Sequence, residues 1–241
     1  MVKPPSSPTA VGPALRAPAA AASKPKLARR GGARSEGVPW PAAVFVTAAH
    51  RLVQMPPDTG VEVAIVGRSN AGKSSALNAI TGKPALARVS KTPGRTQQLV
   101  VFDLEPDSGR RLIDLPGYGY AAVPVTLREH WGIELRLYFE TRTSLRGLVI
   151  AMDIRHPMRE GDLSMIGLAA ARGLPVHVLL TKADKLGRGA ASAQLAAVRR
   201  GLYEIAGELA TVQLFSAPKR DGVEEARRRI IDWLAEVPES A

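Results

Sequence analysis

One segment constrains the fold more than any other: an apolar run, 61–66, leads directly into a glycine-bounded turn. The turn reads Gly67-Arg68-Ser69-Asn70-Ala71-Gly72-Lys73-Ser74 and matches the pattern GxxxxGK(S/T). Its glycines allow backbone N–H groups to point inward at phosphate oxygens, and the helix that follows adds its N-terminal dipole. Lys73 supplies a positive charge to the outer phosphates, and Ser74 supplies an oxygen ligand for Mg²⁺. The pattern therefore predicts an α/β fold that binds a nucleotide through 67–74.

The chain beyond this turn fits such a fold, because apolar runs alternate with helical segments from Val61 onward. We expect strands at 61–66, 97–104, 111–115, 146–152, 175–180 and 210–215. The short connection between the second and third of these contains Pro106, Asp107 and Gly109, which suits a hairpin. The predicted fold is a single P-loop domain with a mostly parallel six-stranded sheet, one antiparallel edge strand and helices on both faces.

A second segment indicates which base is bound. Thr181-Lys182-Ala183-Asp184 closes the fifth predicted strand. The carboxylate of Asp184 can accept hydrogen bonds from the ring N–H and the exocyclic amine of guanine, which adenine does not offer, and the aliphatic stem of Lys182 can cover the ring. The sixth predicted strand ends in Phe215, Ser216 and Ala217, whose backbone N–H groups can support the base edge. We therefore expect GTP and GDP as ligands.

A third segment, Asp114-Leu115-Pro116-Gly117, ends the third predicted strand. Asp114 can hold Mg²⁺ through water, while the N–H of Gly117 can meet the terminal phosphate. This turn is therefore expected to sense whether the terminal phosphate is present.

A candidate switch lies before the second predicted strand, where the sequence reads Lys91-Thr92-Pro93-Gly94-Arg95-Thr96-Gln97. It combines the Gly and Pro of a mobile loop with two hydroxyls. Either Thr92 or Thr96 can reach Mg²⁺, and spacing alone does not choose between them.

Charge and composition divide the chain into two parts. Lys and Arg number 33 against 22 Asp and Glu, which gives a net charge of +11, and seven of the basic residues lie in 1–35 without a single acid. Few aliphatic side chains occur there, so we expect 1–38 to be a disordered, basic, Ala/Pro-rich extension and 39–241 to be the GTP-binding domain. An organelle transit peptide also fits this composition, although a plain basic arm is favoured.

Two absences in the sequence limit the possible classes of protein. Without cysteine, disulfide scaffolds and thiol catalysis are excluded, and a reducing compartment, the cytoplasm, is the simplest expectation. No run of 18 apolar residues occurs, so stable membrane insertion is not expected.

Five stretches together resemble one family, the EngB-type bacterial GTPases among the translation-factor-related P-loop GTPases. They are GRSNAGKSS at 67–75, KTPGRTQ at 91–97, IDLPGYGYA at 113–121, DIRHPM at 153–158 and TKADKL at 181–186, and the resemblance covers about 40–237. It implies a molecular switch in ribosome assembly, with a link to cell division and septation.

The resemblance also implies residue roles. Thr96 becomes the Mg²⁺-binding threonine of the switch, and Lys73, Thr96 and Gly117 form the catalytic set. The residues that border the nucleotide then include Gly94, Arg95, Thr96, Gln97 and Gln98, and Phe215, Ser216 and Ala217 form the last base-contacting segment. The role of DIRHPM stays open between a partner contact and a strand-end turn built by Asp153.

Hydrolysis is expected to be slow in the isolated protein. Tyr118 follows Gly117, where Ras-like proteins place the glutamine that orients the attacking water, and a phenol does not substitute simply for a carboxamide. A partner or a monovalent cation would then stimulate turnover. In some relatives an asparagine at the position of Asn70 helps bind K⁺, although a loop-capping role is equally open.

The expected partners are ribosomal particles or rRNA, bound in the GTP state by a monomer. Two alternatives stay open: a scaffold at the division site or membrane, which the basic extension allows, and a metabolic P-loop kinase or NTPase. The TKAD segment and the lack of an inserted substrate lid disfavour the second.

Overall fold

The computed structural model describes residues 40–84, 86–87, 98–106, 108–119 and 125–235, which belong to one compact unit, Gly37–Ala241. The strands of these residues form one sheet in the order β1-β3-β4-β2-β5-β6-β7. They are β1 (Ala43–Ala49), β2 (Val61–Gly67), β3 (Leu99–Leu104), β4 (Arg110–Asp114), β5 (Leu145–Asp153), β6 (Val176–Thr181) and β7 (Ala210–Leu214). The extension 1–38 and the switch segment 91–97 lie outside the described residues.

The sheet is mostly parallel, which confirms the predicted fold class. Strands β4, β2, β5, β6 and β7 pair in parallel, whereas β3 runs antiparallel to β4 and β1 runs antiparallel to β3. One detail is corrected: the described residues hold seven strands rather than six, so β3 is not at the edge. Strand β1 escaped prediction because its side chains do not alternate; Val44, Phe45 and Val46 are all exposed, and its pairing with β3 shifts register after Phe45.

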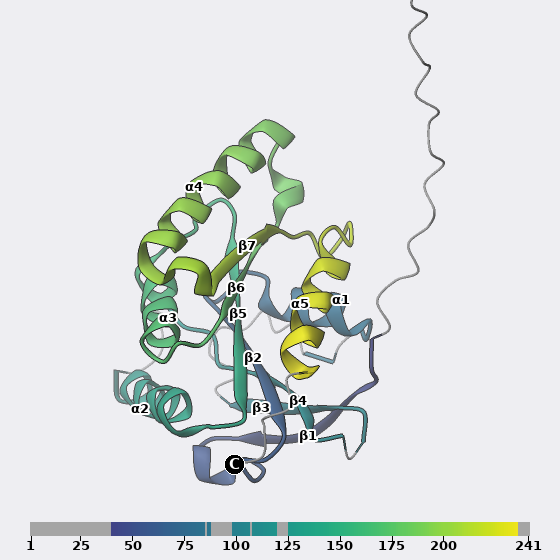
Figure 1. Cartoon of the computed structure of the whole chain (residues 1–241), viewed down its shortest axis with the longest axis vertical. Coiled ribbons are helices and arrows are strands. Elements are labelled where there is room, and N and C mark those ends of the chain that lie inside the picture. Colours follow the sequence, from purple (N-terminus) through teal and green to yellow (C-terminus); the bar gives the residue numbers. More distant parts are fainter. Residues whose placement is uncertain (1–39, 85, 88–97, 107, 120–124, 236–241) are drawn as a thin grey trace, which may run out of the picture. The chain divides into compact units, whose positions relative to one another are not determined.

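Helices cover both faces of the sheet, as predicted. They are α1 (Lys73–Thr81), α2 (Val125–Thr141), α3 (Glu160–Ala171), α4 (Arg188–Ala206) and α5 (Val223–Ala235). Helices α2, α3 and α4 lie on one side of the sheet and α1 and α5 on the other (Figure 1). Among the helices of the described residues, none is both long and apolar enough to span a bilayer.

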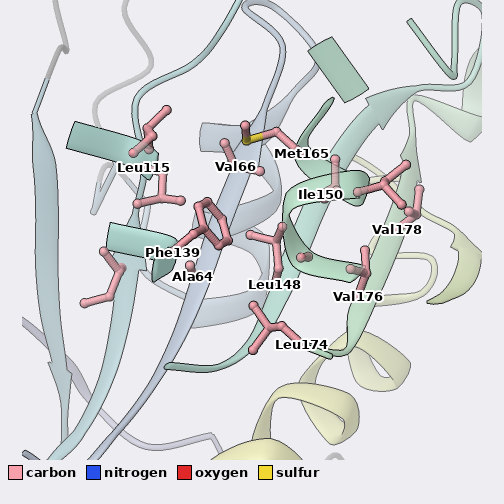
Figure 2. Packing of buried hydrophobic residues seen from close by; sticks show 14 of the residues in the cluster. Ala64, Val66, Leu115, Phe139, Leu148, Ile150, Met165, Leu174, Val176 and Val178 are labelled. Atoms are coloured by element: carbon pink, nitrogen blue, oxygen red, sulfur yellow. The ribbon is translucent and has the colours of Figure 1, made fainter. Parts of the chain in front are cut away.

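The core facing α2, α3 and α4 is built by alternate residues of the central strands. Figure 2 shows the side chains of this face: Ala64 and Val66 from β2, Leu148 and Ile150 from β5, and Val176 and Val178 from β6. All six are fully buried. The intervening residues of the same strands face α1 and α5, so both faces of these strands are apolar, which explains their continuous apolar sequences.

The parallel arrangement brings the ends of four strands to one edge. Ile65 pairs with Asp114, Gly67 with Ala151, and Asp153 with Thr181. The carboxyl ends of β2, β4, β5 and β6 are therefore neighbours, and ligands of open α/β sheets bind outside this edge.

His177 is one of several buried polar residues on these strands that depart from the apolar pattern. The ring of His177 on β6 lies 2.8 Å from the hydroxyl of Thr211 through Nδ1 and 2.8 Å from the side-chain oxygen of Gln213 through Nε2. Burial lowers the pKa of His177 to about 4. The folded protein therefore holds a neutral imidazole at pH values where the unfolded chain already binds a proton.

We expect His177 to make folding stability depend on pH. Below pH 6.5 the unfolded chain gains a proton that the folded state does not accept until about pH 4, so the free energy of unfolding falls across this window by about 3 kcal/mol. Urea unfolding of the protein and of His177→Gln at several pH values measures the difference. The variant should lose this slope, and His156→Gln, which changes an exposed histidine, should keep it. Equal slopes in His177→Gln and the unchanged protein would contradict the assignment.

Candidate functional site

The turn after β2 has the backbone that its glycines permit. Gly72 has φ of 94°, in the left-handed region, immediately before α1 begins. A Cβ atom on Gly67 would lie 2.6 Å from the backbone oxygen of Ala151, so no larger residue fits there. Inside the turn, the N–H of Ala71 donates to the carbonyl of Arg68 at 2.9 Å. The strand-turn-helix unit predicted for 67–74 is therefore present.

Lys73 and Asp114 meet at the start of α1. The ammonium of Lys73 donates to Oδ1 of Asp114, and the two side chains are only 13% and 7% exposed. Asp114 is held in place because it ends β4 and pairs with Ile65 on β2. Lys73, the predicted phosphate-binding cation, and Asp114, the carboxylate predicted to hold Mg²⁺ through water, are thus in contact. Both lie close to Ser74 in the first turn of α1.

The hydroxyl of Ser69 is a further polar group of this turn. It is buried and has no hydrogen-bond partner among the described residues. A Cβ on Gly117 would lie 3.4 Å from this oxygen, so the third predicted segment borders the turn. An unpaired buried hydroxyl is costly unless a ligand pairs with it. Together with the Lys73 ammonium, it fits the acceptor oxygens of a bound phosphate.

Tyr118 is held against α3 and not toward the predicted phosphate-binding turn 67–74, called the phosphate turn below. Its hydroxyl donates to Asp162 at 2.5 Å, and its ring packs so closely on Gly161 that a Cβ there would lie 2.5 Å from Cδ2. Its backbone carbonyl accepts from the N–H of Ser69 at 3.0 Å. Burial, and then the nearby Asp162, raise the pKa of Tyr118 well above its ordinary value, so the phenol stays protonated.

Asp184 is anchored by a residue whose side chain the sequence did not single out. Its Oδ1 accepts a hydrogen bond from the hydroxyl of Ser216 at 2.7 Å, and Ser216 is fully buried. This bond lowers the pKa of Asp184 below its ordinary value, so the carboxylate stays ionised. The N–H of Ala183 donates to the carbonyl of Phe215 at 3.1 Å. The two predicted base-reading segments, 181–184 and 215–217, therefore lie together.

Thr181 connects the base-reading segment with the phosphate turn. Its buried hydroxyl shares its one proton between the backbone carbonyl of Ala71 and, at 2.9 Å, that of Met152 on β5. Sequence reasoning placed Thr181 in the motif but did not predict this bridge, since its two acceptors are backbone atoms far away in the chain.

Several predicted residues are not placed at the site by the structure. Gly94, Arg95, Thr96 and Gln97 lie outside the described residues, together with Thr92. Gln98 is described, and its side-chain nitrogen lies 2.7 Å from Nε2 of His50. Their roles toward the nucleotide stay predictions.

Comparison with known proteins identifies the family of the chain. The model of the 50S ribosome-binding GTPase family matches residues 62–182. A "Probable GTP-binding protein EngB" from Xanthomonas oryzae pv. oryzae (strain PXO99A) is 56% identical over 197 residues, which cover 82% of this chain and 94% of the relative. The chain belongs to the EngB family of GTPases. An EngB from Stenotrophomonas maltophilia (strain K279a) is also 56% identical, over 80% of this chain and 95% of its own.

Solved structures agree on the fold. A crystal structure of a probable EngB superposes with a TM-score of 0.59 at 21% identity and covers 73% of this chain and 100% of its own. Elongation factor SelB from Methanococcus maripaludis reaches a TM-score of 0.52 at 16% identity, over 74% of this chain and 34% of its own. The resemblance to EngB-type GTPases is thus confirmed, and with it the prediction of a GTP-binding GTPase.

We expect Thr181→Val to weaken nucleotide binding. Valine keeps the shape of threonine but leaves the carbonyls of Ala71 and Met152 without their hydroxyl donor, at a cost of about 1 to 3 kcal/mol. Titration calorimetry with GDP measures the loss. As a control, Thr141→Val removes an exposed hydroxyl that bonds within α2 to the carbonyl of Leu137, and affinity should not change. Unaltered GDP affinity in Thr181→Val would show that this bridge does not shape the site.

Proposed function

We propose that this protein is a magnesium-dependent GTP switch that acts in ribosome assembly, most directly on the large subunit, and supports normal cell division and septation. Two observations support the proposal. The phosphate turn and the base-reading segments lie together at one edge of the sheet, joined by Thr181. The matching family is described as a 50S ribosome-binding GTPase. The cytoplasm is the proposed place of action.

The proposed nucleotide site uses all of the predicted segments. The phosphates bind at 67–74, the terminal phosphate at 114–117, and the base at 181–184 and 215–217, with 94–98 as the bordering switch. Mg²⁺ bound by Ser74 and Thr96 would neutralise charge that develops on the phosphate oxygens. Lys73 binds the outer phosphates, and Asp114 holds the Lys73 ammonium in position.

Slow turnover follows from the position of Tyr118. Its hydroxyl is held by Asp162, at the start of α3, and so is not available to orient an attacking water. We propose that a ribosomal partner, or K⁺ bound near Asn70, completes the catalytic arrangement. The division into an extension, 1–38, and a GTP-binding domain, 39–241, is part of the same proposal, with the extension adding contacts to RNA phosphates.

We expect Asp184→Asn to change base preference from guanine to xanthine. The amide offers a donor where guanine presents its own donors, and xanthine carries an acceptor oxygen in place of the exocyclic amine. The loss for GTP should be on the order of 2 to 4 kcal/mol. Competition binding with GTP, ATP and xanthosine triphosphate measures it. Equal affinity of the unchanged protein for ATP and GTP would contradict the assignment of Asp184.

We expect association with large ribosomal particles in the GTP state alone. Thr96 and Gly117 are proposed to gain contacts only when the terminal phosphate is present, so the switch segments order together. Co-sedimentation of lysate particles with protein loaded with a non-hydrolysable GTP analogue or with GDP tests this. Retention should weaken as salt is raised, and a chain lacking residues 1–35 should bind more weakly with the same nucleotide preference.

Asp184→Asn provides the matched control. Loaded with a xanthosine triphosphate analogue it should co-sediment, and with a GTP analogue it should not. No association in either nucleotide state, or equal association in both, would contradict the switch and favour the scaffold or metabolic alternatives.

A further inference from the structure

The DIRHPM segment is engaged within the protein. Asp153 ends β5, and the guanidinium of Arg155, two residues later, binds its carboxylate. Nε of Arg155 donates to Oδ1 at 2.9 Å and Nη2 donates to Oδ2 at 2.6 Å. The backbone N–H of Arg155 donates to Oδ1 as well, at 3.1 Å. The side chain of Asp153 is 14% exposed. Three N–H groups of Arg155 therefore hold the Asp153 carboxylate in one orientation at the turn that follows β5.

The same carboxylate reaches the base-reading segment. Nζ of Lys182 lies 2.9 Å from Oδ2 of Asp153 and donates to the backbone carbonyl of Asn70, in the phosphate turn, at 2.6 Å. Register explains the contact with Asp153: Asp153 pairs with Thr181, so Lys182 is the next residue beyond the edge of the sheet. The ammonium thus joins three segments, the ends of β5 and β6 and the turn after β2.

Two partners in this arrangement have an uncommon backbone. Lys182 has φ of 58° and Asn70 has φ of 63°, both in the left-handed region that non-glycine residues seldom adopt. Such conformations persist where surrounding contacts hold them, and they concentrate at ligand sites. The ammonium of Lys182 provides a contact of this kind, since it connects one strained residue to the backbone of the other.

The contact remains ionic at ordinary pH. Burial by itself would raise the pKa of Asp153, but the hydrogen bonds from Arg155 and Lys182 hold it well below its ordinary value. The carboxylate therefore carries its charge at any pH at which the protein is assayed, and it attracts the ammonium throughout that range.

We propose that Asp153 is a positioning residue for guanine-nucleotide binding, which fixes Lys182 so that its aliphatic stem lies over the base, while Arg155 fixes the Asp153 carboxylate. The inference rests on the proposed role of Lys182 at the base. The ammonium of Lys182 contacts the carboxylate of Asp153 and the carbonyl of Asn70, and neither contact involves Gly117, which is proposed to meet the terminal phosphate. Asp153 should therefore affect GTP and GDP alike and leave the chemical step unchanged.

The test compares Asp153→Asn with the unchanged full-length protein. Asparagine keeps the shape and one acceptor oxygen but loses the charge that holds Lys182. Dissociation of a fluorescent GDP and of a fluorescent non-hydrolysable GTP analogue should each quicken about tenfold, the loss of one charge-assisted contact. In steady state the KM for GTP should rise, with kcat within about twofold. As a matched control, Asp103→Asn removes a carboxylate that pairs with Arg111 on a neighbouring strand, and dissociation should not change.

A double-mutant cycle separates positioning from a general structural role. In Lys182→Met, which keeps an unbranched stem without the charge, adding Asp153→Asn should change dissociation by less than about twofold. Should Asp153→Asn not fold, Arg155→Gln serves instead, because the Arg155 side chain is 43% exposed. As a single variant, Arg155→Gln should quicken nucleotide dissociation a few-fold. In the Lys182→Met background it should not change dissociation. Unchanged dissociation in both single variants, or the full effect of Asp153→Asn retained in Lys182→Met, would overturn the proposal.

The same variants, together with Asp184→Asn, distinguish a failure of the Asp153 proposal from a failure of the proposed base site. If Lys182 does not contact the base, Lys182→Met alone leaves guanine-nucleotide release unchanged. If Asp184 does not read the base, Asp184→Asn leaves the preference for guanine over xanthine unchanged. The second result can occur while Asp153 and Lys182 still couple, so it reports on the base assignment of Asp184 alone. The first result would overturn the positioning role of Asp153 together with the role of Lys182.

Discussion

Parallel pairing of β2 with β4 and β5, and of β5 with β6, is the constraint on which the site depends. It places the ends of four strands side by side, although the residues that follow them are separated by dozens of positions in the chain. The approach is close, since Gly67 leaves no space for a Cβ beside the carbonyl of Ala151. The hydrogen bonds that Thr181 and Lys182 donate to the phosphate turn span this edge.

Those contacts are made largely between side chains and backbone carbonyls. Thr181 donates to Ala71 and Met152, and Lys182 donates to Asn70. Because these donors lie at the ends of rigid strands, the edge of the sheet fixes the distances between them and their carbonyl acceptors in the phosphate turn. In the same way Ser216, two residues beyond the end of β7, orients the carboxylate of Asp184 through a hydrogen bond.

The segment after Asp114 is held by contacts on two sides. Its backbone follows the phosphate turn through the bond from Ser69 to the carbonyl of Tyr118, while the Tyr118 side chain is engaged with α3. The small size of Gly161 allows the ring to pack there. The segment is thus attached on one side to the phosphate turn and on the other to α3, so a displacement of this segment would change the contacts on both sides.

The sequence by itself determined the α/β class, the strand-turn-helix at 67–74 and the motifs at 114–117 and 181–184, because these depend on local periodicity and on glycines in a fixed spacing. It also carried the EngB family resemblance. Only the tertiary structure decided that β1 pairs with β3 at the edge of the sheet. An exposed segment without alternating apolar residues forms a strand because it hydrogen-bonds to its neighbour. The same holds for the partners of Thr181, Asp184, Tyr118 and Asp153: hydrogen-bond partners distant in sequence follow from strand order and register, which no local pattern of residues encodes.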